Sequence, residues 1–271
     1  MGSSGSPQEG TSTAKTTARG KIFVWGCLTV LVISVIGAVF LFSSAFWAMR
    51  WTDYRAGSNL KSWAYAFRMY AQEQGGYCPV LSAEPGRLMF EVDGFYPEYC
   101  PFPEALLSVA DPLADEIDFS ECDAAFFYEN SSYFYMGYEV WNDEVVEAFA
   151  RAYRKRVREG LGFDEDLPVD LQQGEFRAEK LTRQDYGGWE GPTKYLTFFE
   201  SEIPLLIERP HPYPGSRGLY VLFFWVPLSK PEMGGTVLYQ DGHVEFIPYP
   251  GKWPMTERTI SLLAELSKLR Y

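Results

Sequence analysis

The sequence predicts an α+β fold in which a long N-terminal helix, transmembrane and then amphipathic, packs on an antiparallel β-sheet. Three observations predict this fold: an uncharged apolar run over residues 22–49, a helical apolar pattern soon after it, and a hairpin signal near the C-terminus. The chain has 271 residues, of which 46% are hydrophobic and 17% aromatic. It is therefore long enough and apolar enough to build the core of one or two domains.

The charge balance and the motif content exclude several classes of function. The formal net charge is −12, and a surface that binds nucleic acid needs positive charge to neutralise phosphates, so we expect no nucleic-acid partner. The only histidines are His211 and His243, which excludes a three-histidine zinc site. The chain lacks GxSxG, HExxH, paired CxxC and Gly-rich phosphate-loop motifs. We expect no catalytic residue, no cofactor and no metal, and we predict that the protein is not an enzyme.

The uncharged run, Ile22–Met49, predicts one transmembrane helix that contacts membrane lipid. Its 28 residues contain no charge. As a helix it would be ~42 Å long, whereas a bilayer core is ~30 Å thick. Trp25 and Trp47 lie near its ends, where tryptophan favours the headgroup region. A cleaved signal peptide is the alternative, because Ser43-Ser44-Ala45 resembles a cleavage site, although such a peptide has a shorter apolar region.

The flanking charges bear on the orientation of this span. Basic residues lie on both sides of it, so the positive-inside rule is close to balanced. Residues 50–271 carry 21 basic and 35 acidic residues, a balance that is easier to export than a basic one. We expect a disordered tail over residues 1–21, a cytoplasmic N-terminus, and an extracytoplasmic domain over residues 50–271. This topology is that of a single-pass protein of the inner (cytoplasmic) membrane with a periplasmic domain.

The exported part alternates between helical and strand patterns. An amphipathic helix is predicted where Leu60, Trp63 and Phe67 recur at helical spacing, ended by Gly75-Gly76. Asn142 is a candidate N-cap. The remaining expectations are a loop-rich region over 77–131, a strand over 131–140, a helical insertion over about 141–200 with its helix at 141–160, a strand over 203–208, a strand or hairpin over 219–226, and a helix over 256–269.

The segment TVLYQDGHVEFI predicts a β-hairpin. Asp241-Gly242 between two alternating runs indicates a two-residue type I′ turn, so both residues are expected to have structural roles. A two-residue loop would pair Tyr239 with Val244. It would also place His243 on the polar face, as a structural residue; Pro210 and Pro212 make His211 a loop residue.

The cysteines and the acidic loop are also expected to be structural. Cys27 lies in the predicted span, which leaves Cys78, Cys100 and Cys122 for one bridge in an oxidising compartment. We expect Cys78–Cys100, because each begins a Cys-Pro step that borders the same loop; Cys100–Cys122 is the alternative. Asp111, Asp115, Glu116, Asp118, Glu121 and Asp123 could suggest calcium, but without EF-hand spacing we expect a solvated loop.

The order of a membrane helix, NLKSWAYAFRMYAQEQGGY, SSYFYMGY and GGTVLYQDGHVEFIPYPGK resembles a known family. It is similar to the pilin-like and type II secretion pseudopilin-like proteins of planctomycetes, including those with an H-x9-DG processing-associated domain. The resemblance implies a pilin-like fold, a membrane anchor and protein partners in an envelope assembly. Two features depart from the family: the span lacks the acidic residue of a prepilin, and 29 residues separate His211 from Asp241 in place of nine.

The resemblance implies a non-catalytic, membrane-anchored protein of an envelope or secretion-related structure, or one that presents a binding surface. The alternative is a membrane-tethered extracytoplasmic enzyme that acts on a polymer through paired carboxylates. Such a pair would require two carboxyl groups about 5–10 Å apart, one with a raised pKa.

Overall fold

The computed structural model describes residues 25, 28–39, 57–92, 94–99, 102–108, 110–118, 122–174, 176–185, 200–213, 218–221, 224–227 and 232–269. The chain divides into two compact units. One unit comprises Met1–Met49 and Gly218–Val226, and the other comprises Arg50–Arg217 and Pro227–Tyr271. The described elements are a mixture of helices and antiparallel strands, so the α+β class is confirmed.

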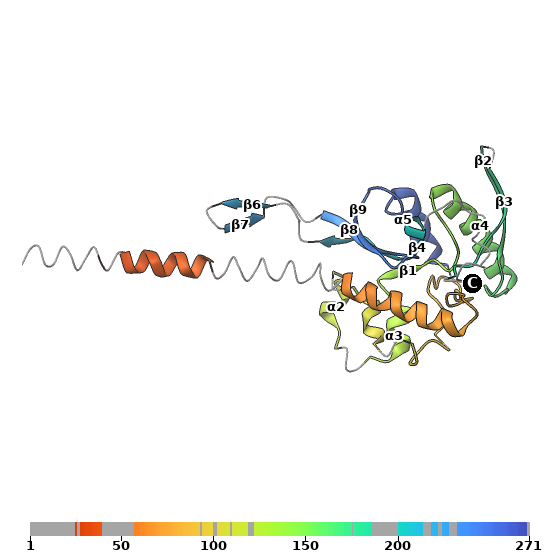
Figure 1. Cartoon of the computed structure of the whole chain (residues 1–271), viewed down its shortest axis with the longest axis horizontal. Helices are drawn as coiled ribbons and strands as arrows, with labels where there is room; N and C mark the ends of the chain where they lie inside the picture. The colour runs from red at the N-terminus through yellow and green to blue at the C-terminus, as the bar shows by residue number, and fades with distance from the viewer. Residues whose placement is uncertain are drawn as a thin grey trace, which may run out of the picture. The chain divides into compact units, whose positions relative to one another are not determined.

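The first unit contains a helix over residues 28–39 and a separate strand pair. The strands β6 (Gly218–Val221) and β7 (Phe224–Pro227) form a two-stranded sheet of their own (Figure 1). For residues 219–226 the sequence is compatible with a strand or a hairpin, and the structure has two paired strands. Within the described residues, no helix combines the length and the apolar character that a membrane crossing requires. Most of the expected span Ile22–Met49 and the expected tail over residues 1–21 lie outside the described residues.

The second unit is built on a five-stranded antiparallel sheet. Its order is β1-β4-β8-β5, and β9 pairs with the other side of β8. β4 and β5 both pair with β8, with the corner at Arg209-Pro210 between them. The strands are β1 (Tyr133–Tyr135), β4 (Pro204–Glu208), β5 (His211–Tyr213), β8 (Glu232–Tyr239) and β9 (Val244–Pro248).

The predicted amphipathic helix spans residues 57–73 and packs on this sheet (Figure 1). Leu60, Trp63 and Phe67 are fully buried, and the Phe67 ring lies 5.7 Å from the ring of Tyr135 in β1. The helix ends where Gly75 takes a φ of 69°, in the left-handed region that favours glycine. The apolar stripe that predicts the helix is therefore its contact with the sheet.

Two further helices, α4 (Asp143–Glu159) and α5 (Glu257–Leu266), contact each other and lie apart from helix 57–73 (Figure 1). The Asn142 side chain accepts a hydrogen bond from the Val145 N–H at 3.0 Å, as expected of an N-cap. Gly160 ends α4 in the left-handed conformation. Arg154 of α4 forms an ion pair with Glu265 of α5 at 2.9 Å, and this pair links the two helices.

The structure adds elements that the sequence analysis missed. Asp123 caps a short helix by accepting from the Phe126 N–H, and Asp111 accepts from the Leu113 N–H in a turn, so part of the acidic loop is ordered local structure. The expected strand over 131–140 is shorter, because Tyr138 forms only an isolated bridge with Arg183. The missed elements are η1 (Pro103–Leu106), α2 (Leu113–Glu116), α3 (Ala124–Glu129), β2 (Leu167–Gln173), β3 (Phe176–Leu181) and η4 (Glu200–Glu202).

The β8–β9 hairpin is confirmed, but its register is one residue away from the prediction. Leu238 pairs with Val244, whereas a two-residue loop would pair Tyr239 with Val244. The Tyr239 N–H donates to the His243 carbonyl, and the Gly242 N–H donates to the Tyr239 carbonyl. The connection therefore has three residues, with Gly242 at a φ of 87° in the bulge position. The shift gives Tyr239 and His243 the same face, on which their rings stack with centroids 4.2 Å apart.

Candidate functional site

The hairpin end carries the two residues that the sequence marks as structural, Asp241 and Gly242. The Asp241 carboxylate accepts from the His243 N–H at 2.9 Å and lies 2.6 Å from His243 Nδ1. Arg68 of helix 57–73 donates to the Asp241 carbonyl at 2.5 Å. Asp241 and His243 thus hold the turn closed, and Arg68 fastens that turn to the helix.

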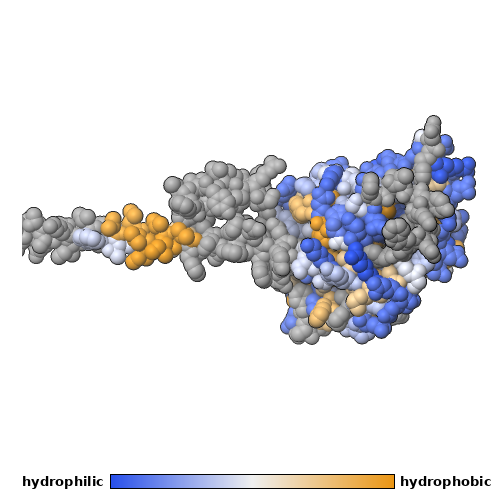
Figure 2. Space-filling view, in the orientation of Figure 1, coloured by the Kyte–Doolittle hydropathy of each residue, from blue (hydrophilic) through white to orange (hydrophobic). Residues whose placement is uncertain are grey.

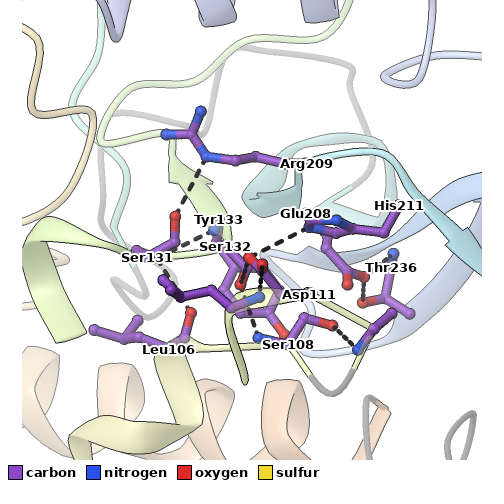
Figure 3. A network of polar contacts seen from close by, with 12 residues as sticks. Leu106, Ser108, Asp111, Ser131, Ser132, Tyr133, Glu208, Arg209, His211 and Thr236 are labelled. Atoms are coloured by element: carbon purple, nitrogen blue, oxygen red, sulfur yellow. Dashed lines mark hydrogen bonds and ion pairs between the residues drawn. The ribbon is translucent and has the colours of Figure 1, made fainter. Parts of the chain in front are cut away.

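A buried polar network joins the 106–111 loop, the start of β1 and the β4–β5 corner (Figure 3). Its centre is Glu208, which is completely buried. The Tyr213 hydroxyl donates to both carboxylate oxygens, at 2.6 and 2.8 Å, and the Thr236 N–H donates at 2.6 Å. The Thr236 hydroxyl donates as well. Because these donors surround the carboxylate, its burial is compensated by hydrogen bonds from within the fold.

The same network contains a serine, an aspartate and a histidine. Ser132 Oγ donates to Asp111 Oδ2 at 2.6 Å, and it accepts from the Ser108 N–H at 2.8 Å. His211 Nε2 lies 3.6 Å from the same Oδ2 atom and is buried with no hydrogen-bond partner among the described residues. The aspartate therefore lies between the serine and the histidine. A hydrolytic triad needs the histidine in the middle, so this arrangement does not activate Ser132.

His211 was expected in a loop, but it begins β5 and pairs with Gly234. Arg209 at the preceding corner donates to the Ser131 carbonyl at 3.3 Å and lies over the Phe134 ring, 4.3 Å from its centroid. Burial lowers the pKa of the Arg209 guanidinium, and the nearby Asp111 opposes that effect. These contacts hold the corner against β1.

A second buried group, Glu139, was missed by the sequence analysis. It is 1% exposed, and neither carboxylate oxygen has a hydrogen-bond partner among the described residues. Burial raises the pKa of Glu139 to about 8, and the charges of Asp185 and Asp166 add to the effect. The signal that could have found it is a single acid in the aromatic stretch YFYMGYEVW. At neutral pH this carboxyl group is mainly protonated.

Gln184 holds the chain segments around Glu139 together. Its side-chain amide donates to the carbonyls of Met136, Tyr138 and Pro204 at 2.6, 3.1 and 2.7 Å. The Gln184 N–H donates to the Gly137 carbonyl at 3.0 Å. The surroundings of Glu139 are therefore cross-linked, and its carboxyl is enclosed within the fold.

The predicted cysteine pairing is not formed at Cys78, which is a free, buried thiol. Cys122 is also free, so the alternative bridge is absent at that residue, and Cys100 lies outside the described residues. Burial raises the pKa of Cys78, and Asp185 raises it further, so this thiol is unreactive. The two Cys-Pro steps suggested that Cys78 and Cys100 border the same loop. In the structure, the Cys78 N–H donates to the Gln184 carbonyl at 2.9 Å.

Across the parts of the chain that the structure describes, no three His, Cys, Asp or Glu side chains converge as a metal-binding group would. In the acidic loop, Asp123 caps a short helix, and Asp111 accepts hydrogen bonds from the Leu113 N–H and from Ser132. Protein-family models, curated proteins and solved structures all lack a match to this chain.

Proposed function

We propose that this chain is a non-catalytic, membrane-anchored pilin-like protein whose domain over residues 50–271 lies outside the inner membrane. In that position it contributes to an envelope assembly or a secretion-related structure, or presents a binding surface there. The observation that carries the proposal is the helix over residues 28–39, whose large apolar side chains are exposed all round the helix.

The exposure of this helix is what a lipid-facing helix requires. Val30, Leu31, Ile33 and Ile36 are each more than 60% exposed, and the visible surface of the helix is hydrophobic (Figure 2). A helix that is apolar all round is stable only when something apolar covers it. The Thr29 hydroxyl is satisfied within the helix, because Thr29 Oγ1 donates to the Trp25 carbonyl at 2.5 Å. The visible face of the second unit is mainly hydrophilic (Figure 2).

The polar clusters of the second unit support a non-catalytic role. The donors around Glu208 come from its own fold, and Glu139 is enclosed at 1% exposure. One observation favours the alternative of an enzyme with paired carboxylates, because Glu139 has a raised pKa and interacts with Asp185. Loss of polymer hydrolysis in a folded Glu139→Gln variant would support that enzyme.

Alkaline carbonate extraction and protease protection test the proposal. We expect the full chain to remain in the membrane pellet, with its large domain digested in spheroplasts and protected in inverted vesicles. Ile33→Lys with Ile36→Lys should release it, because each central charge costs about 2.5–3.5 kcal/mol in a span. Ile33→Leu with Ile36→Leu is the matched control and should stay in the pellet. A soluble wild-type chain that begins near residue 45 would instead indicate a cleaved signal peptide.

A further inference from the structure

We propose that the exposed basic face of helix α4, formed by Arg151, Lys155 and Arg158, binds an acidic peptide segment of a partner protein. That segment carries several Glu or Asp side chains with an apolar side chain beside them. The inference goes beyond the proposed function and does not depend on the membrane anchor, because the residues that carry it all lie in the second unit.

The three side chains of the basic face lie on one side of α4. Lys155 follows Arg151 by four residues and precedes Arg158 by three, a spacing that makes neighbours on the surface of a helix. All three residues are exposed, whereas apolar side chains of α4 such as Phe149 and Tyr153 are fully buried. The basic face therefore points away from the core.

The fold pairs the other basic side chains of α4, but not those of the basic face. Arg154 forms an ion pair with Glu265 of α5 at 2.9 Å, and Arg156 lies 3.7 Å from Glu165. Among the described residues, no ion pair involves the basic face. Glu159, which ends α4, is exposed and forms no ion pair within the described part of the chain either. An anionic partner from outside the domain can therefore reach all three cations.

The electrostatics of the helix itself do not account for the basic face. A cation is favoured at the C-terminus of a helix, but the effect falls off within the last turn. Arg151 lies about two turns before the end of α4 at Glu159. Like charges four residues apart, as at Arg151 and Lys155, also repel each other. A negatively charged ligand would relieve that repulsion.

The surroundings of the basic face favour a peptide over a phosphate polymer or a membrane. Arginine side chains bind carboxylates in a bidentate manner. Leu161, directly beyond the Gly160 that ends the helix, is 48% exposed and offers an apolar contact that a peptide side chain can use and polyphosphate cannot. A helix that lies on a membrane inserts its apolar face, whereas the apolar face of α4 is buried in the core.

The test is the fluorescence anisotropy of a fluorescein-labelled peptide of four Glu-Glu-Leu repeats, titrated with the full chain in nonionic detergent at physiological salt. We expect the basic-face variant, Arg151→Gln with Lys155→Gln and Arg158→Gln, to bind about tenfold more weakly, because each exposed ion pair contributes modestly. If this variant fails to fold, Arg151→Gln with Lys155→Gln replaces it, and the same direction is expected.

The matched control removes the same charge from exposed residues outside α4. It combines Lys61→Gln, Arg177→Gln and Lys252→Gln, and it should bind the peptide as the wild type does. Leu161→Ser tests the apolar contact. It should weaken binding of the Glu-Glu-Leu peptide and leave binding of a peptide of four Glu-Glu-Gln repeats unchanged.

Several outcomes would overturn the inference. The wild-type chain could fail to bind the peptide, or the basic-face and control variants could lose binding equally, which would reflect overall charge alone. Equal binding of polyphosphate or of phosphatidylglycerol vesicles, lost in the basic-face variant, would assign the face to phosphate groups. Self-association of the wild type that the basic-face variant loses in sedimentation would assign the face to a second copy of the chain.

Discussion

Single buried carboxyl groups in this fold are accommodated in two opposite ways. Glu208 is surrounded by donors from Tyr213 and Thr236. Glu139 has no hydrogen-bond partner among the described residues and holds its proton to about pH 8. The first group therefore stabilises the fold through its hydrogen bonds. The second is tolerated because it is neutral.

Replacing Glu139 by glutamine should change how stability depends on pH. The ordinary pKa is 4.5, and the folded-state pKa is about 8. Stability linked to this group is therefore fully present below about pH 4.5 and is lost as the pH rises toward 8. Glu139→Gln stays neutral, so its free energy of unfolding should gain on wild type between pH 5 and 9. Urea unfolding of the full chain in detergent measures this gain, and parallel pH profiles would contradict the prediction. Exposed Glu98→Gln is the control.

Replacing Glu208 by glutamine should destabilise the protein. In the variant, the N–H₂ group of the glutamine would face the Tyr213 and Thr236 donors that bind the Glu208 carboxylate in the wild type. We therefore expect a loss of about 2–4 kcal/mol in the free energy of unfolding. Thr236→Val removes one hydroxyl donor only, and it should cost about 1 kcal/mol. Chemical denaturation of both variants checks the order. An equal or smaller loss for Glu208→Gln would show that the network is not held by its carboxylate.

At the scale of elements, the β8–β9 hairpin is attached to helix 57–73 through its turn. Arg68 donates to the Asp241 carbonyl, and a side chain added at Gly242 would lie 3.0 Å from the Arg68 guanidinium. The turn conformation and its contact with the helix are thus set by the same three residues.

Gly242→Ala should therefore lower the free energy of unfolding, by about 1–2 kcal/mol, because alanine rarely adopts a φ of 87°. Gly57→Ala is the matched control. A methyl group added at Gly57 would meet open space in the first turn of helix 57–73, where alanine should be neutral or stabilising by up to ~1 kcal/mol. Thermal unfolding compares the two. A neutral Gly242→Ala would mean that the turn relaxes to another conformation.

The elements that the sequence predicted well are those with strong local signals. The spacing of Leu60, Trp63 and Phe67, the Asn142 cap and the Asp241-Gly242 turn each act within a few residues. The hairpin register was wrong because a bulge at Gly242 adds one loop residue, and Asp-Gly is compatible with both turn types. The lack of a hydrogen-bond partner at Glu139 among the described residues, and the contact between Asp111 and His211, depend on segments that are far apart in the sequence. No local pattern contains them.

At the scale of the whole molecule, the described helix 28–39 of the first unit is apolar on its visible surface, and the visible face of the second unit is mainly hydrophilic (Figure 2). Pilin-type subunits pair a carboxylate in their span with the amino terminus of a neighbouring subunit during assembly. The run Ile22–Met49 contains no carboxylate. We infer that the chain is an anchored monomer or an accessory component.

The corresponding prediction concerns the N-terminus. Because Lys21 follows Gly20 and no acid lies in the run, the chain should not be processed between these residues. Mass spectrometry of the protein from native membranes should find Gly20 and Lys21 still joined. A chain that begins at Lys21 with a methylated amine, recovered from sheared surface filaments, would contradict this expectation.

The burial of helix 57–73 has a mechanical consequence. Seven residues lie between Met49 and the first described residue of this helix, so a pull on the anchor reaches the domain through this helix first. Its side chains Leu60, Trp63 and Phe67 are fully enclosed, and they would have to leave the core together. Burial of each is worth roughly 2–3 kcal/mol. Tension should therefore stretch the domain elastically until it gives way in a single rupture, and a force trace recorded by pulling on the anchor should show one peak.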